Sequence, residues 1–246
     1  MRTLLRLAYD GTDFSGCPAL AGERTVCGEL RAALERVDLA PSLIETLSRT
    51  DAGVHARGNV AHVVLPRPVQ ARELLSMLDR HLPLDVRAHA AWAVPELPPV
   101  LCKTYRYSLD LHPHGDPAVH RTAWRPPGAV DATVFERALR AAEGTHDFEA
   151  FRRTGETRQE LTRTLTDIRV EVEGHALHAF ITGSGFVYRM VRSLVGGAVT
   201  VARGGASLAD FVAAIDGVPS GCSRQTAPAK GLCLLGMKLE DRALED

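Results

Sequence analysis

A pattern of strands and helices that occurs twice along the 246-residue chain constrains the fold most strongly. Strands are expected in the first half at 2–10, 43–49, 58–66, 86–94 and 101–111, with helices at 25–38 and 69–82. The second half is expected to contain a helix at 131–144, strands at 164–174 and 176–183, helices at 186–204 and 207–216, and a closing strand at 231–240. Helices interleaved with long alternating strands predict an α+β fold, with mixed or mostly antiparallel sheet and the helices on one face.

Residues 112–130 separate the two occurrences of the pattern. This stretch, HPHGDPAVHRTAWRPPGAV, is rich in Pro, Gly and His and has no periodicity. The sequence therefore predicts an N-terminal half over residues 1–111, a linker over 112–130 and a C-terminal half over 131–246.

Several classes of protein are disfavoured by what the sequence lacks. No window approaches ~18 consecutive apolar residues, so no membrane span is expected, and the N-terminal residues suit a strand better than a signal peptide. Neither GxGxxG nor GxxxxGK[ST] occurs, and the five cysteines form no CxxC pair. We therefore expect a cytoplasmic protein without a metal site, a dinucleotide-binding site or a P-loop.

The formal net charge is −1, but the positive charge is almost entirely arginine, since the only lysines are Lys103, Lys230 and Lys238. The planar guanidinium fork suits phosphates and flat bases better than an ammonium does. A bias of the genome towards arginine would give the same composition, so composition alone leaves nucleic-acid binding open.

The stretch LSRTDAGVHARG, residues 47–58, places charged side chains at the end of an expected strand. Arg49 and Asp51 are two residues apart and share a face of an extended segment, and Gly53 permits a tight turn. A neighbouring guanidinium favours the ionised carboxylate, which is the form a nucleophile needs. The alternative is a surface ion pair that closes a turn and stabilises it little.

A resemblance to a known family covers most of the chain. SRTDAGVHARGNVAH resembles the active-site signature of TruA-type tRNA pseudouridine synthases, whose usual form is GRTD-x-GVHA. Six further blocks match that family in order: YDGTDFSG (9–16), RTVCGEL (24–30), CKTYRYSL (102–109), GTHDFEAF (144–151), GFVYRMVRSLVGG (185–197) and TAPAKGLCL (226–234). Their common order makes the resemblance specific.

The resemblance implies an architecture and a reaction. It implies two similar α/β halves whose sheets form a central sheet, an active-site cleft between the halves, and a homodimer. The expected reaction isomerises uridine to pseudouridine in tRNA, in the anticodon arm, without metal or cofactor. Asp51 is the implied essential carboxylate; it attacks the ribose anomeric carbon or the uracil ring, or removes a proton from the 2′ carbon, and the sequence leaves these three routes open.

The family's active-site tyrosine matches Tyr105. Tyr107 shares its face of the strand, so the spacing alone does not separate the two. Arg189 and Arg192 are neighbours on one helical face with apolar residues around them, so one is expected to be semi-buried. The family pattern indicates Arg192 as the partner of Asp51 and Arg189 as a substrate contact, although the reverse assignment stays open.

Further residues are expected to bind substrate. Arg49 is expected to fill the space of an extruded base or to hold a phosphate, while His55 and Arg57 contact the RNA backbone. Arg152 and Arg153, with Arg158 and Arg163, form an arginine-rich loop that is expected to clamp RNA or, alternatively, to be merely solvated.

Two departures from the family pattern keep the substrate open. Ser48 replaces the usual glycine, and residues 17–23, CPALAGE, replace a segment that normally resembles WQ-x-Q. Three hypotheses therefore remain: isomerisation of uridine in tRNA, the same isomerisation of a free uridine nucleotide, and an inactive RNA-binding module. Retention of Asp51, Tyr105 and Arg192 argues against the third.

Overall fold

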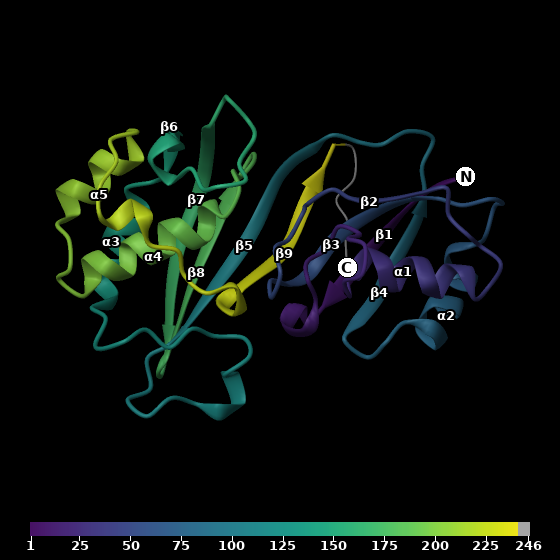
Figure 1. Cartoon of the computed structure of the whole chain (residues 1–246), viewed down its shortest axis with the longest axis horizontal. Helices are drawn as coiled ribbons and strands as arrows, with labels where there is room; N and C mark the ends of the chain where they lie inside the picture. Colours follow the sequence, from purple (N-terminus) through teal and green to yellow (C-terminus); the bar gives the residue numbers. More distant parts are fainter. Residues whose placement is uncertain (241–246) are drawn as a thin grey trace. The chain divides into compact units, whose positions relative to one another are not determined.

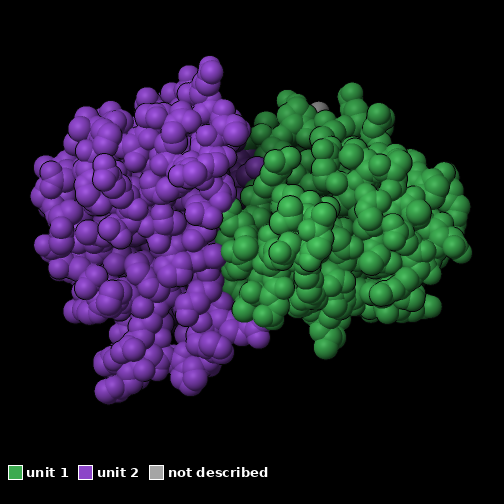
Figure 2. Space-filling view, in the orientation of Figure 1, with its two compact units in different colours: residues 1–101, 233–246 green, residues 102–232 purple. Residues whose placement is uncertain are grey.

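The computed structural model describes residues 1–240; the last six residues of the expected C-terminal half, 241–246, lie outside the described part. The chain forms two compact units (Figure 2). Unit 1 comprises residues 1–101 together with the C-terminal segment from residue 233, and unit 2 comprises residues 102–232.

Unit 1 is a largely antiparallel sheet with two helices. Its strands are β1 (Arg2–Tyr9), β2 (Leu43–Thr46), β3 (His55–Val64), β4 (Val86–Ala93) and β9 (Leu232–Leu239). Its helices are α1 (Val26–Glu35), α2 (Ala71–His81) and the short 3-10 turn η1 (Gly11–Asp13). Strand β1 lies between β4 and β3, with both pairings antiparallel, and α2 packs on β4 (Figure 1).

Strand β3 carries two partners on its other edge. Ala61–Val64 pair with β2, and His55 and Ala56 pair in parallel with Cys233 and Leu234 of β9. The chain leaves β2 and enters β3 through residues 47–54, so the segment that contains Asp51 connects two paired strands.

Unit 2 is an antiparallel sheet of four strands in the order β5-β8-β7-β6. These strands are β5 (Val100–Asp110), β6 (Gly144–Asp147), β7 (Thr162–Glu173) and β8 (Ala176–Gly183). Its helices are α3 (Ala132–Arg140), α4 (Met190–Ala202) and α5 (Leu208–Ile215), with 3-10 turns η2 (Pro117–Val119), η3 (Phe148–Phe151), η4 (Cys222–Arg224) and η5 (Ala229–Gly231). The three α-helices lie together over one face of this sheet (Figure 1).

The predicted α+β class with mostly antiparallel sheets and helices to one side is confirmed. The unit boundaries differ from the expected halves because pairing joins segments that are distant in sequence. Strand β9 belongs to unit 1 through its pairing with β3, and β5 belongs to unit 2 through its pairing with β8.

The expected linker, residues 112–130, lies within unit 2. Trp124 donates its amide hydrogen to the Ser108 carbonyl at 2.9 Å, and Asp110 donates to the Trp124 carbonyl at 2.9 Å. These bonds tie the segment to the end of β5.

Candidate active site

The segment around Asp51 is a tight turn in unit 1. The Val54 amide donates to the Asp51 carbonyl at 3.1 Å, and Gly53, at the third position, has φ 77°. A positive φ at this position is what a type II turn requires, and glycine adopts it without strain. The Gly53 amide in turn donates to the Phe14 carbonyl at 3.2 Å, which holds the turn against the segment after η1.

Burial alternates along the four residues that lead into this turn. Ser48 and Thr50 are buried, Arg49 is exposed, and Asp51 is intermediate. The buried pair therefore faces the interior, while Arg49 and Asp51 lie on the more open side. Asp51 is therefore neither fully solvated nor fully buried.

A cluster of polar side chains lies behind the turn. Asn59 of β3 donates from Nδ2 to the Tyr9 hydroxyl oxygen and to the Ser48 carbonyl, both at 2.9 Å. The Tyr9 hydroxyl lies 2.8 Å from the Thr50 Oγ1. Burial raises the Tyr9 pKa well above its ordinary value of 10.0, so the hydroxyl remains protonated at neutral pH.

His55, the first residue of β3, is buried and makes a structural contact. Its Nδ1 accepts the Gly11 amide hydrogen at 3.1 Å and also lies 3.2 Å from the Asp10 Oδ1. A ring nitrogen that accepts from an amide cannot at the same time donate to a carboxylate, so the two contacts exclude one another in a single tautomer. Arg57, two residues on, is exposed.

The two tyrosines of β5 differ in their surroundings. Tyr107 is fully buried, donates its hydroxyl hydrogen to the Pro228 carbonyl at 2.7 Å, and has a pKa raised by burial. Gly231 lies so close that an added Cβ would fall 2.5 Å from the Tyr107 ring. Tyr105 is buried as well, and its ring stands nearly perpendicular to that of Phe186, with 5.0 Å between ring centroids. The Tyr107 hydroxyl is thus bound to the backbone of a distant segment.

Helix α4 carries the predicted arginines at its start. Arg192 is half-buried and donates from Nε to the Ala227 carbonyl at 2.8 Å, while the Ala227 amide donates to the Arg192 carbonyl at 2.9 Å. The helix lies close to that loop because of Gly196, where a Cβ would fall 2.9 Å from the Gln225 carbonyl oxygen. The expectation that one of the two arginines is semi-buried therefore describes Arg192.

Arg189 immediately precedes α4 with φ 60°, a left-handed conformation that is uncommon outside glycine. Its guanidinium carbon lies 4.7 Å from the centroid of the Tyr188 ring. The helix begins at Met190, four residues later than the apolar pattern predicts, because Arg189 interrupts the helical conformation.

Arg152 and Arg153 in the arginine-rich loop make internal contacts. Arg152 binds both carboxylate oxygens of Glu149, with distances of 2.7 and 2.9 Å. Arg153 donates to the Thr226 hydroxyl at 2.9 Å and also to the Gln225 carbonyl at 3.2 Å. Burial, with repulsion from Arg189, lowers the Arg153 pKa. The internal contacts of Arg153 tie this loop to the segment that Arg192 also contacts.

Glu156 joins the same loop to the segment before α4. Its carboxylate accepts both side-chain and backbone hydrogens from Arg158, and accepts the Tyr188 amide hydrogen at 2.7 Å. Arg158 also donates to the Phe186 carbonyl at 3.1 Å. These bonds, chiefly those from the Arg158 guanidinium, lower the Glu156 pKa to about 2.

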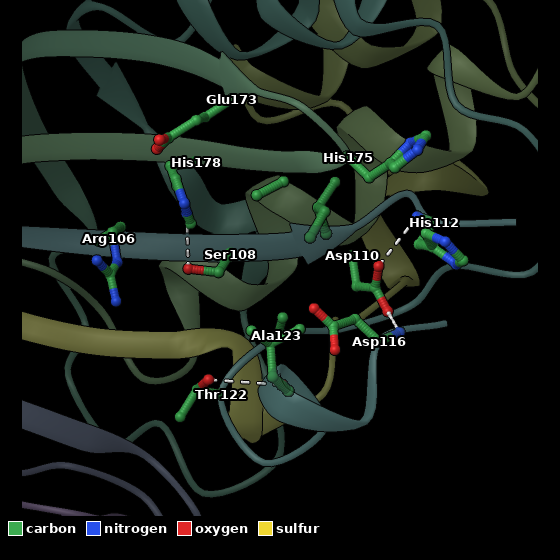
Figure 3. A pocket seen from close by; sticks show the side chains of 13 residues that line it. Arg106, Ser108, Asp110, His112, Asp116, Thr122, Ala123, Glu173, His175 and His178 are labelled. Atoms are coloured by element: carbon green, nitrogen blue, oxygen red, sulfur yellow. Dashed lines mark hydrogen bonds between the residues drawn. The ribbon is translucent and has the colours of Figure 1, made fainter. Parts of the chain in front are cut away.

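A pocket of about 340 Å³ lies on the face of β5 opposite to Tyr105 and Tyr107 (Figure 3). Arg106, Ser108 and Asp110 line it, and they alternate along the strand with Tyr105 and Tyr107. The pocket is therefore separated by the sheet from the side on which the predicted tyrosine lies.

Within this pocket, His178 Nδ1 lies 2.9 Å from the Ser108 hydroxyl, and burial lowers the His178 pKa. Burial raises the Asp110 pKa, but hydrogen bonds from the amides of Asp116 and His112 outweigh that effect and lower it. Ser108, His178 and Asp110 thus have partners in the walls of the pocket, whereas the buried Arg106 Nε has none among the described residues.

Sequence reasoning missed Asn59, Tyr9 and Glu156. A signal for the first exists, since Asn59 is an amide in a mainly apolar stretch of the strand, GNVAHVV. Among residues 1–240, no group of three or more His, Cys, Asp or Glu side chains is arranged to hold a metal ion, and no helix is long and apolar enough to cross a membrane.

Comparison with known proteins gives a consistent result. A family model described as tRNA pseudouridine synthase matches residues 138–238. A tRNA pseudouridine synthase A of Syntrophotalea carbinolica is 33% identical over 238 residues, covering 94% of this chain and 93% of that protein. Enzymes of the same name from Brevibacillus brevis and Geobacter sulfurreducens are 35% and 34% identical, covering 93% and 95% of this chain and 95% and 98% of theirs.

Among solved structures, a Cbf5-Nop10-Gar1 complex matches with a TM-score of 0.39 and 14% identity, over 80% of this chain and 44% of that one. The identity to curated relatives extends over nearly the whole of both chains. The chain belongs to the tRNA pseudouridine synthase family.

Proposed function

We propose that Asp51 is the essential carboxylate with which this isomerase of the tRNA pseudouridine synthase family converts uridine in tRNA to pseudouridine. The observation that carries this proposal is the Asp51 turn itself. It presents a half-buried carboxylate on a backbone that is hydrogen-bonded on both sides, between two paired strands. A reacting carboxylate needs such a fixed, partly water-shielded position.

The reaction conserves every atom of the substrate. The bond from N1 of uracil to C1′ of ribose breaks, the base turns, and C5 forms a new bond to C1′, while C5 loses a proton and N1 gains one. Asp51 acts by attack on C1′, by attack on the uracil ring, or by removal of the 2′ proton. An ionised Asp51 serves all three routes.

Tyr105 and Arg192 are the proposed partners of Asp51 in the reaction. Tyr105 is 7% exposed and its ring packs nearly perpendicular to Phe186; its proposed roles, stacking on uracil and proton removal from C5 by its hydroxyl, rest on its match to the family's tyrosine. Arg192 keeps its Nε on the Ala227 carbonyl, which fixes the guanidinium for an interaction with a carboxylate.

The proposed RNA contacts divide into exposed and internally bonded groups. Arg49, Arg57 and Arg189 are exposed and suited to phosphate binding. Arg152 and Arg153 would contact RNA through the guanidinium hydrogens that are not used in their internal hydrogen bonds. The buried His55 would act by holding the turn in place. Arginine contacts to phosphate require that tRNA affinity fall steeply with salt.

The names of the relatives favour tRNA over a free nucleotide or an inactive module. The anticodon arm as target, a homodimer and a cytoplasmic location complete the proposal, and these rest on the family resemblance. The molar mass of the protein in solution, measured by light scattering after size-exclusion chromatography, tests the dimer.

One assay separates the hypotheses. The purified protein is incubated with unmodified tRNA and, separately, with UMP, and pseudouridine is measured. We expect product from tRNA alone, and Asp51→Ala should abolish it while leaving the thermal midpoint within a few degrees. Product from UMP alone would support the nucleotide hypothesis, and an active Asp51→Ala variant would exclude the proposed role of this carboxylate.

A further inference from the structure

Asn59 occupies the centre of a polar cluster that the reaction chemistry does not use. It lies on β3, is fully buried, and uses both hydrogens of its carboxamide, one on the Ser48 carbonyl and one on the Tyr9 hydroxyl oxygen. Its own Oδ1 accepts the amide hydrogen of Val60 at 2.9 Å. Every strong hydrogen-bonding group of this side chain is therefore occupied.

Tyr9 extends the cluster by one residue. Because its oxygen accepts from Asn59, its own hydrogen is available to the Thr50 Oγ1, 2.8 Å away. The carbonyl of Thr50 also accepts the Cys17 amide hydrogen at 3.1 Å. Thr50, the residue before Asp51, is thus held through both its side chain and its backbone.

The two residues that the cluster holds, Ser48 and Thr50, are those that point inward. Fixing them restricts the positions of Arg49, which lies between them, and of Asp51, which follows, on the more open side of the segment. A displacement of a reacting group by about 1 Å can lower a rate by ~100-fold, so the rotation of this segment matters for the Asp51 carboxylate.

We propose that Asn59 and Tyr9 are positioning residues for Asp51: their buried hydrogen bonds to Ser48 and Thr50 set the orientation of the catalytic carboxylate. This inference rests on the proposed function of Asp51. The two side chains touch no reacting atom, and they are inferred to affect turnover and not substrate binding.

The cluster also contributes to stability, and the two roles give different results. A purely structural cluster lowers activity only through the fraction of protein that unfolds. A positioning cluster lowers kcat in fully folded protein and leaves KM nearly unchanged, because tRNA binding does not depend on the position of one carboxylate.

The test uses Tyr9→Phe as the mildest change, since it removes one oxygen and keeps the ring. Turnover of unmodified tRNA is measured well below the thermal midpoint, together with KM and tRNA affinity. We expect kcat to fall roughly 10- to 100-fold, with KM and tRNA affinity within about twofold of wild type. Asn59→Ala should lower kcat further, and Asn59→Gln, which restores a carboxamide, should recover at least part of that loss.

Ser207→Ala serves as the matched control. It removes the cap of α5, where Ser207 accepts from the Asp210 amide at 3.0 Å, and it should destabilise the protein to a similar degree without lowering kcat. The positioning role is overturned if Tyr9→Phe keeps the wild-type kcat, or if its kcat falls no more than that of Ser207→Ala.

Asp51→Ala is measured beside these variants to separate two kinds of failure. If Asp51→Ala is inactive and Tyr9→Phe is fully active, the carboxylate is essential but the cluster does not position it. If Asp51→Ala turns over tRNA, the proposed function of Asp51 fails, and the positioning role fails with it. If Asn59→Ala does not fold, the Tyr9→Phe result still decides between these outcomes.

Discussion

The Asp51 turn in unit 1 is backed by neutral buried hydrogen bonds, whereas the loop of residues 152–160 in unit 2 contains exposed ion pairs. Behind the turn, an amide, a phenol and a hydroxyl bind one another out of contact with solvent. In the loop, Arg152 binds Glu149 and Arg158 binds Glu156, with at least one partner of each pair well exposed. The turn is predicted to keep its geometry across pH and salt, and the loop is not.

The two regions also differ in how they accommodate a positive φ. The turn places Gly53 there, with φ 77°, and glycine adopts this conformation freely. The entrance to α4, which Glu156 contacts, places Arg189 there with φ 60°. A non-glycine residue is strained in this region, and such strain concentrates where function demands a particular geometry.

Gly11→Ala should have the largest effect, because Gly11 of η1 packs directly against the backbone of Val54 at the end of the Asp51 turn. An added Cβ would lie 2.0 Å from the Val54 carbonyl oxygen and 2.4 Å from its carbon, far inside contact distance. We expect a loss above ~3 kcal/mol in the free energy of unfolding, together with loss of turnover, measured by chemical denaturation and by tRNA assay.

Gly155→Ala provides the comparison in the loop of unit 2. Its Cβ would lie 3.5 Å from the Tyr188 ring, an ordinary contact, so only the φ of 100° opposes the change. We expect about 1–2 kcal/mol. Equal losses for Gly11→Ala and Gly155→Ala would contradict the view that the first turn is the more rigidly packed.

Glu156→Gln tests the dependence of the loop on charge. The folded pKa of about 2 lies below the ordinary 4.5, so the carboxylate stabilises the fold above about pH 4.5 and its contribution is lost as the pH falls from 4.5 towards 2. At pH 7 we expect the variant to lose about 1–3 kcal/mol, nearer the lower value because the partner Arg158 is half-exposed.

The difference in unfolding free energy between wild type and Glu156→Gln should shrink through that pH window. Glu35→Gln is the control, since the Glu35 carboxylate is half-exposed and its ion pair with Arg31 is long, at 4.0 Å. The unfolding free energies of wild type and Glu35→Gln should show no comparable difference. A pH-independent gap between wild type and Glu156→Gln would show that the loop depends on shape and not on charge.

Arg189→Val should be less stable than Arg189→Asn by about 1 kcal/mol, because a β-branched residue resists the left-handed region that asparagine tolerates. Both variants lose the same charge and the same contact with Tyr188, so their difference isolates the backbone. For a chain of this size we expect a difference of roughly 2–4 °C in the thermal midpoint. Equal midpoints would mean that the entrance to α4 relaxes without strain.

Much of the fold could be predicted from the sequence because it depends on local periodicity. The alternating strands, the helices and the turn at Gly53 are all visible in neighbouring residues. The pairing of β9 with β3 is not, since strand partners are chosen by global packing. The start of α4 is also hidden, because nothing in its sequence marks Arg189 as a residue with positive φ.

The candidate site shows the same division. The motif predicts the turn of Asp51, but the spacing of Tyr105 and Tyr107 cannot reveal that Pro228, 121 residues away, accepts the Tyr107 hydroxyl hydrogen. In the sequence, the arginines of the loop indicate RNA binding. The sequence gives no sign that Glu156 binds Arg158, and only the structure shows that bond. These hydrogen bonds depend on the folded arrangement, and a local pattern does not contain them.

Salt should produce the smallest effect and separates the two regions directly. Raising ionic strength from 0.1 to 1 M shortens the screening length from about 10 Å to about 3 Å, which weakens exposed ion pairs but not neutral buried bonds. The amides of Arg158 and Tyr188, which donate to the Glu156 carboxylate, should exchange with solvent a few-fold faster at high salt. The amides of Gly53 and Val54 should not change.

Hydrogen exchange of peptides that contain these amides measures the effect. Glu156→Gln supplies the control, since in this variant the exchange of the Arg158 and Tyr188 amides should no longer depend on salt. If both regions respond equally to salt, the Asp51 turn depends on charged groups more than its neutral cluster indicates. If only the loop responds, a uridine would meet a carboxylate whose position is independent of ionic conditions, and salt would act on the enzyme through its contacts with RNA phosphate.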